Sequence, residues 1–342
     1  MKALRALSRL AAAAVAALAT VWASLAAYWS DIPGQTGRTA LAAGIVLAAV
    51  LIFAGIRRRA VAYAVFAAAL AGFSLWWAAI PASGVRDWQR DVAVLPFAQV
   101  QGDLVTVHDI RHFAYTTETD YKPGYYDKAF DLKTLDSVDL IAVYWMGDAI
   151  AHVMVSFGFG GRDYLCLSIE TRKEVGEAYS SVKGFFKQYE LTYVVADERD
   201  LIRLRTGYRN PPEDVYIYRT RMTPENARLL FMEYVKEINR LHETPEFYNT
   251  LTTNCTTNVV RHLRAFGGKA RYNWKILLSG YAPRYAYEMG ALDDALPFEA
   301  LRAASHVNGK AASAGDADDF SARIREGLPG VPPCASRAAV GK

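Results

Sequence analysis

The residues best suited to chemistry lie in a short polar stretch, residues 252–258, which contains Cys255. Apolar residues at helical spacing follow this stretch, and a glycine pair follows them: Val259, Val260, Leu263 and Phe266, then Gly267 and Gly268. The pattern predicts a helix that begins near Asn254 and ends at the glycines. Cys255 would lie in the first turn, where unpaired backbone N–H groups and the helix dipole favour a thiolate. A nucleophilic cysteine needs this environment, but a small buried cysteine near a helix start would show the same pattern.

Among six histidines, His152 is the best candidate for a base that serves Cys255. It lies within an apolar run, 149–157, in which strand alternation places His152, Met154 and Ser156 on one face. A histidine in such a strand is costly unless something uses it. The competing interpretation is a core histidine with satisfied hydrogen bonds. His262 shares a helix face with Cys255, but two helical turns, roughly 10 Å, would separate them.

A third residue is expected on the neighbouring strand. Gly160 and Gly161 predict a turn, after which residues 164–170 return with Ser168 and Glu170 on one face. The loop length decides which of the two lies opposite His152. A nucleophile, a base and a polar group that orients the base form the general triad. We prefer Glu170 because a carboxylate stabilises an imidazolium, although an exposed pair between Glu170 and Arg172 would also explain this residue.

Other residues are candidates for supporting roles. Backbone N–H groups at Cys255 and Thr256, with the side chain of Asn254, are placed to stabilise an oxyanion. Arg111 and Tyr115 belong to a predicted strand at 104–115 and could contact substrate head groups, although such residues are more often rim residues. The cysteines show no metal-binding spacing, and no glycine-rich loop opens a helix, so we expect neither a metal nor another cofactor.

The N-terminal part of the chain predicts a membrane anchor. Three apolar runs, at 10–29, 40–56 and 60–81, have about the length of a membrane span. A cleaved signal peptide is less favoured because two further runs follow the first. Basic residues precede the first run (Lys2, Arg5 and Arg9) and join the second to the third (Arg57, Arg58 and Arg59). The positive-inside rule then places the N-terminus in the cytoplasm and everything after residue 84 outside it.

The rest of the 342-residue chain has an α+β pattern. Strands are predicted at 104–115, 138–145, 149–159, 164–170, 191–196 and 215–219, and helices at 223–241, from 254, at 274–278 and at 298–304. We therefore expect an anchor at 1–84, a catalytic domain at 85–307 and a disordered tail at 308–342, which would contain Cys334. The net charge of +4 forms no basic stripe, so nothing points to nucleic acid.

The order of the predicted elements, a histidine strand before a cysteine helix, is the reverse of that in papain. It resembles circularly permuted papain-like enzymes of the NlpC/P60 and lecithin:retinol acyltransferase type, which carry a cysteine helix after an antiparallel sheet. Five runs resemble more closely the Lnb N-terminal periplasmic domain family: 107–115, 151–157, 167–174, 189–200 and 245–257. The runs are distributed along the region of about residues 85–300, to which the resemblance applies. The resemblance implies an enzyme that moves an acyl chain from a glyceryl ester of a bacterial lipoprotein to the amine of its N-terminal cysteine.

The residues predict a thiol nucleophile, Cys255, with His152 as base and Glu170 as orienting group, and the resemblance implies that they act as an acyltransferase with a thioacyl-enzyme intermediate. It would be anchored in the bacterial inner membrane with a periplasmic domain. Its partners would be the lipid bilayer and the acyl chains of lipoproteins or phospholipids. The alternatives are a cysteine hydrolase of a peptidoglycan amide or a lipid ester, and a non-catalytic envelope scaffold. The acyl donor, the acceptor and the oligomeric state stay open.

Overall fold

The computed structural model describes residues 2–30, 32 and 34–332. The chain divides into two compact units. Unit 1 consists of Met1–Val85, Glu177–Glu190 and Glu246–Thr250, and unit 2 of Arg86–Gly176, Leu191–Pro245 and Leu251–Lys342.

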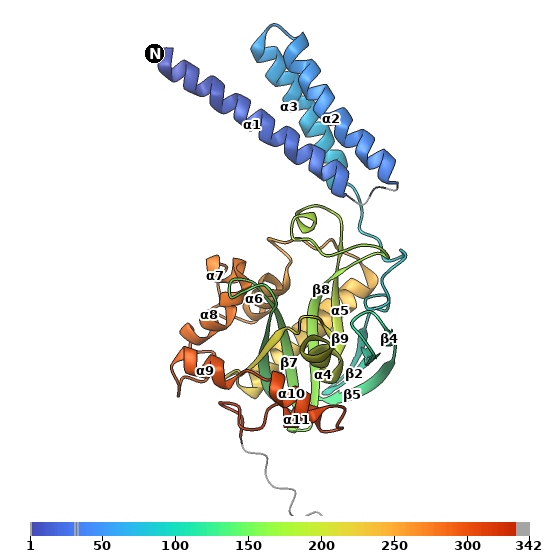
Figure 1. Ribbon diagram of the computed structural model, residues 1–342, viewed down its shortest axis with the longest axis vertical. Helices are drawn as coiled ribbons and strands as arrows, with labels where there is room; N and C mark the ends of the chain where they lie inside the picture. Colours follow the sequence, from blue (N-terminus) through green and yellow to red (C-terminus); the bar gives the residue numbers. More distant parts are fainter. Residues whose placement is uncertain (1, 31, 33, 333–342) are drawn as a thin grey trace, which may run out of the picture. The chain divides into compact units, whose positions relative to one another are not determined.

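Unit 1 contains three apolar helices: α1 (Lys2–Trp29), α2 (Gln35–Gly55) and α3 (Arg59–Ala78) (Figure 1). Each is long and apolar enough to cross a membrane, which confirms the three expected runs. Each helix also begins before its apolar run does. The unit further includes a loop with the short helix η2 (Lys183–Phe185). Lys187 of this loop donates hydrogen bonds to the carbonyl oxygens of Ala78 (2.8 Å) and Ile80 (2.7 Å), so it caps the end of α3.

Unit 2 is built on an eight-stranded sheet with the strand order β1-β2-β9-β8-β7-β6-β10, in which β5 also pairs with β2. The strands are β1 (Phe97–Gln101), β2 (Leu104–Arg111), β5 (Tyr125–Asp131), β6 (Leu135–Tyr144), β7 (Ala151–Phe159), β8 (Asp163–Arg172), β9 (Glu190–Ala196) and β10 (Asp214–Arg219). The prediction of an antiparallel sheet is wrong in one respect. Arg111 of β2 pairs with Ala196 of β9 in parallel, so the sheet is mixed. A separate small ribbon joins β3 (Ala114–Tyr115) to β4 (Tyr121–Lys122).

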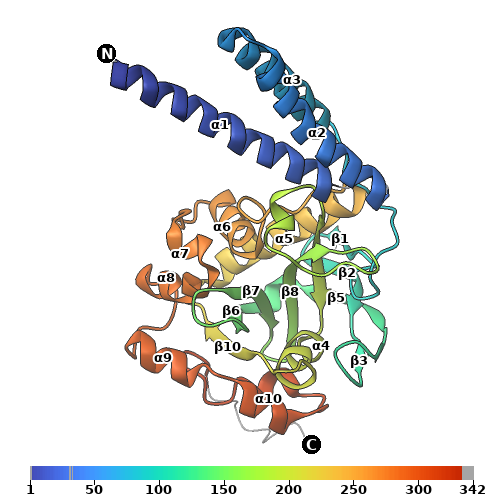
Figure 2. The ribbon, with the colours of Figure 1, turned by 45° about the horizontal axis from the view of Figure 1, so that its top comes forward.

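Helices cover both faces of the sheet (Figure 2). They are α4 (Glu198–Arg203), α5 (Pro224–Glu243), α6 (Cys255–Ala265), α7 (Trp274–Leu277), α8 (Ala282–Glu288), α9 (Phe298–Ala304), α10 (Asn308–Ala314) and α11 (Phe320–Arg323), with short turns η1 (Leu132–Thr134), η3 (Leu204–Tyr208) and η4 (Ser279–Tyr281). Strand alternation separates two apolar clusters. Ile141 and Met154 pack with α4, α10 and α11, whereas Leu140 and Val153 pack with α6, α8 and α9.

The prediction of a disordered tail from residue 308 is wrong for residues 308–332. Helices α10 and α11 pack against α4, and Phe320 and Ile324 are buried in the same apolar cluster as Met154. Arg325 is 1% exposed and donates to Glu198 through Nη1 (2.7 Å) and Nη2 (2.6 Å) and to Asp139 through Nε (2.7 Å). A charged residue that is buried with two carboxylates fixes this segment to the sheet. Residues 333–342, with Cys334, lie outside the described residues.

Candidate active site

Cys255 is the first residue of α6, as the sequence predicted. The side-chain oxygen of Asn254 accepts a hydrogen bond from the backbone N–H of Thr257 at 2.8 Å, so Asn254 is the N-cap. The hydroxyl of Thr256 donates to the same oxygen at 2.9 Å and to the carbonyl of Ile276 at 2.8 Å. These side chains therefore hold the first turn in place. The backbone N–H groups of Cys255 and Thr256 lie in the same first turn, where a helix offers no carbonyl acceptor, and they are placed to bind an anion beside Cys255.

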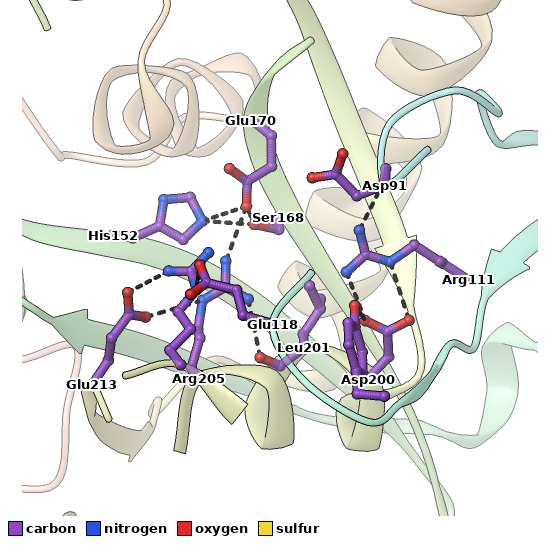
Figure 3. A network of polar contacts seen from close by, with 12 residues as sticks. Asp91, Arg111, Glu118, His152, Ser168, Glu170, Asp200, Leu201, Arg205 and Glu213 are labelled. Atoms are coloured by element: carbon purple, nitrogen blue, oxygen red, sulfur yellow. Dashed lines mark hydrogen bonds and ion pairs between the residues drawn. The ribbon is translucent and has the colours of Figure 1, made fainter. Parts of the chain in front are cut away.

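His152 is the second residue of β7, and its partners come from β8. Met154 pairs with Ser168 in an antiparallel register, which places Glu170 at the level of His152. His152 Nε2 lies 2.6 Å from Ser168 Oγ and 3.1 Å from Glu170 Oε1 (Figure 3). Cys255 packs against the apolar cluster that contains Ala151 and Val153, the two strand neighbours of His152, and it is among the groups that raise the pKa of His152. The structure thus brings His152, Ser168, Glu170 and Cys255 together.

The donor count fixes the tautomer of His152. Ser168 has one hydroxyl proton, which it donates to Glu170 Oε1 at 2.6 Å. The Ser168 oxygen must therefore accept a hydrogen bond from His152, and the Glu170 carboxylate accepts as well, so Nε2 of His152 carries a proton. The other ring nitrogen, Nδ1, remains for proton exchange with a neighbour.

Opposite charges dominate the electrostatics of this group. Burial disfavours the charged imidazole, but the Glu170 carboxylate and the neighbouring Cys255 outweigh burial and raise the pKa of His152 to about 9. Burial also opposes the ionised form of Glu170, but His152 and the Arg205 guanidinium hold the pKa of this carboxyl well below its usual range. At neutral pH the site therefore holds an imidazolium beside a carboxylate.

Arg205 is a member of this group that the sequence analysis missed. It is 3% exposed, and its Nη2 donates to Glu170 Oε1 at 3.0 Å. Its Nη1 donates to the carbonyl of Leu201 at 3.0 Å, and its Nε lies 3.9 Å from Glu213 (Figure 3). Arg205 belongs to η3, a π-helix, an element that is rare and frequent at functional sites. No local pattern distinguishes an arginine that is buried in this way from one on the surface.

Arg111 and Tyr115 form a separate polar group around Asp200. Arg111 donates to both Asp200 oxygens, at 3.1 Å through Nε and at 2.6 Å through Nη2, and to the carbonyl of Asp91 at 2.9 Å. The Tyr115 hydroxyl donates to Asp200 at 3.0 Å, as does the backbone N–H of Phe113 at 2.8 Å. Arg111 is 6% exposed, and these contacts pair its buried charge with Asp200. A substrate contact by Arg111 or Tyr115 stays a prediction.

His262, the other histidine considered for Cys255, contacts a tyrosine instead. Its Nε2 lies 2.8 Å from the Tyr193 hydroxyl, and burial, with the neighbouring Arg261 charge, lowers the pKa of this imidazole to about 4. Among residues 2–30, 32 and 34–332, no cluster of three or more histidine, cysteine or acidic residues could hold a metal ion.

Residues 121–280 match the family model of the Lnb N-terminal periplasmic domain. The matched segment contains His152, Ser168, Glu170, Arg205 and Cys255. No curated protein and no solved structure matches the chain significantly. The family match, with three candidate membrane helices before it, indicates a membrane-anchored protein with an extracytoplasmic domain.

Proposed function

We propose that this chain is a cysteine-dependent acyltransferase that moves an acyl chain from a lipoprotein glyceryl ester to the N-terminal cysteine amine. Three observations support the proposal: the proximity of Cys255 to the His152–Glu170 pair, the position of Cys255 at a helix N-terminus, and the match to the Lnb domain. The first carries it, because a thiol beside a histidine that a carboxylate orients is the arrangement of a thiol nucleophile. A histidine strand before a cysteine helix is also the order of permuted papain-like enzymes, and we propose this relationship for the domain.

In the first half-reaction, protonated His152 stabilises the thiolate of Cys255. The sulfur attacks the ester carbonyl carbon, and backbone N–H groups of Cys255 and Thr256 stabilise the oxyanion. Collapse of this intermediate breaks the carbon–oxygen bond. The leaving alkoxide takes a proton from His152 Nδ1, so that an alcohol and a thioester are formed and His152 becomes neutral.

In the second half-reaction, the amine of the acceptor attacks the thioester carbon. The amine nitrogen loses a proton to His152, and collapse breaks the carbon–sulfur bond. The products are an amide, the Cys255 thiolate and protonated His152, which is the starting state. Throughout, Glu170 and Ser168 hold the Nε2 proton and therefore the ring orientation.

The three apolar helices fit this chemistry because they would hold the thiol at the height of a lipid ester and so raise its effective concentration. We propose that they lie in the inner membrane, with the N-terminus in the cytoplasm and the domain in the periplasm. The partners of the protein would then be the bilayer and the acyl chains of lipoproteins or phospholipids.

A mass-spectrometric assay tests the proposal. The full chain in lipid nanodiscs is incubated with a diacylglyceryl lipopeptide that has a free N-terminal cysteine amine. We expect the total mass of the lipopeptide to stay unchanged while one acyl chain moves to the amine. Release of one chain as free fatty acid would instead identify a lipid hydrolase that uses the same residues.

Two cysteine variants give the matched controls. Cys255→Ser should abolish the transfer, whereas Cys166→Ser, at a fully buried cysteine of β8, should retain it. Activity that survives Cys255→Ser would overturn the proposed mechanism. If the lipopeptide stays intact with both the wild type and the variants, the substrate assignment is wrong.

A further inference from the structure

An apolar cavity of about 370 Å³ lies between α6 and the sheet of unit 2. Val153 and Val155 of β7 form one wall, Val259 and Leu263 of α6 form another, and Ala286 of α8 closes it together with Ile276. This volume falls in the range of roughly 300–1,000 Å³ that is typical of small-molecule sites. No step of the mechanism above uses this space.

The cavity reaches the first turn of α6, where Thr256, the residue after Cys255, and Val259, one helical turn beyond Cys255, line it. Cys255 and Val259 pack against the same apolar cluster, which includes the cavity-lining residues Leu140, Val153 and Ala282. From there the cavity follows α6 from Thr256 to Phe266. Ten residues of helix correspond to about 15 Å. Carbon–carbon bonds of ~1.5 Å in a zigzag advance about 1.25 Å each, so this length suits a chain of roughly a dozen carbons.

Most of the lining is apolar, and four charged or amide residues also line the cavity: Asp139, Arg221, Asn226 and Lys269. Asp139 and Arg221 form ion pairs with residues outside the lining. Its hydroxyl groups already have backbone partners: Thr256 donates to Ile276 at 2.8 Å, Thr220 donates to Val138 at 2.8 Å, and Tyr285 accepts from Arg271 at 2.9 Å. These groups therefore present their carbon atoms to the cavity. Against the valine, leucine and alanine side chains of the lining, a polar group would lose its hydrogen bonds to water without replacement, whereas an alkyl chain would gain from burial.

We infer that this cavity binds one saturated acyl chain, whose carbonyl carbon is thereby presented to Cys255, and that its length selects the chain that is transferred. This inference rests on the proposed function, because it places the acyl chain of the donor. It adds a specificity site in which α6 has two roles. The N-terminus of α6 carries the nucleophile, and the apolar face of α6 lines the cavity that limits the length of the acyl chain.

The test uses alkyl methanethiosulfonates, which need no catalytic turnover. The thiolate attacks the sulfenyl sulfur of the reagent, forms a mixed disulfide that carries the alkyl group, and releases methanesulfinate. The full chain in nanodiscs, with Cys334→Ser, reacts with methyl or dodecyl reagent, and peptide mass spectrometry measures modification of Cys255. Ala286→Phe fills the cavity, and Ala265→Phe, at an exposed position of α6, is the control.

We expect Ala286→Phe to slow the dodecyl reaction by about tenfold. A factor of this size corresponds to two methylene groups of the reagent that can no longer enter the apolar cavity. The methyl reaction should keep its rate, which also shows that the variant is folded, and Ala265→Phe should change neither rate. Leu263→Ala, which lengthens the cavity, should raise the rate of a hexadecyl reagent relative to the dodecyl one. The inference is overturned if both reagents slow equally in Ala286→Phe, or if neither slows. Because labelling requires no ester or amine, the proposed acyl transfer can fail while this result stands.

Discussion

At the scale of single residues, the site depends on one carboxylate. Glu170 Oε1 lies within hydrogen-bond distance of donors on His152, Ser168 and Arg205. The negative charge of Glu170 raises the pKa of His152, and the same charge is stabilised by Arg205. Glu170 thus sets both the tautomer and the protonation state of the base.

Glu170→Gln should therefore lower the pKa of His152 from about 9 towards its ordinary value of 6.5. Histidine-selective NMR on the full chain measures this, with His152→Gln to assign the signal. Glu118→Gln, at the exposed end of the same polar chain, should leave the titration unchanged. An unchanged titration in Glu170→Gln would show that Glu170 does not control the base.

The same shift predicts how stability depends on pH. The folded-state pKa of His152 is raised, so its ion pair with Glu170 contributes fully below pH 6.5 and is lost as the pH rises through about 9. Urea unfolding between pH 6 and 10 should show the wild type losing stability over this window, and Glu170→Gln should lack that loss. Parallel curves for the two proteins would contradict the assignment.

The sequence located some of the residues that the structure brings together and missed one of them, for physical reasons. Cys255 and His152 were identifiable because each breaks a periodic pattern, one at a helix start and one in an apolar strand. The choice between Ser168 and Glu170 needed the strand register, and the structure shows that both contact His152. Arg205 could not be found, because its burial depends on the packing of η3 against the sheet.

At the scale of elements, the N-cap of α6 couples folding to the position of the thiol. Asn254→Ala should lower the free energy of unfolding by about 1 kcal/mol, because the N–H of Thr257 loses its acceptor. It should also slow alkylation of Cys255, because the first turn loosens. Asn273→Ala removes the matching cap of α7 and serves as the control. A loss of stability without slower alkylation would contradict the coupling.

The C-terminal segment is held by a buried charge. Arg325→Ala should cost about 3–5 kcal/mol in urea unfolding, because the buried Glu198 would lose its paired arginine and Asp139 would be left with Arg219. Arg323→Ala removes an exposed pair with Asp319 and should cost less than about 1 kcal/mol. Equal effects of the two substitutions would mean that the segment does not stabilise the fold.

The prediction of a disordered tail was wrong because tertiary packing, which local sequence does not show, orders residues 308–332. Residues 308–332 are rich in small and polar residues, and the helices α10 and α11 are short. Helices of this length are marginal alone and form because tertiary packing buries one face. The long strands β6, β7 and β8 were predictable because alternation and apolar content act locally. The parallel pairing of β2 with β9 joins residues far apart in the chain, and no local pattern encodes it.

At the scale of the whole molecule, the chain combines three apolar helices with an Lnb-type domain match. The proposed acyl transfer requires the domain to meet lipoproteins on the outer side of the inner membrane. Charge predicts this orientation, because Arg57, Arg58 and Arg59 join the second and third helices and three crossings bring the rest of the chain outside.

Cysteine labelling in spheroplasts tests the orientation. In a background of Cys255→Ser and Cys334→Ser, where Cys166 is buried, one new cysteine is introduced at Lys133 or at Arg58. Lys133 is an exposed residue of unit 2, and Arg58 is exposed before α3. A membrane-impermeant maleimide should label Lys133→Cys in intact spheroplasts and Arg58→Cys only after permeabilisation. The reverse pattern would place the domain in the cytoplasm, where it could not reach the glyceryl esters of exported lipoproteins, and the proposed substrate would have to be abandoned.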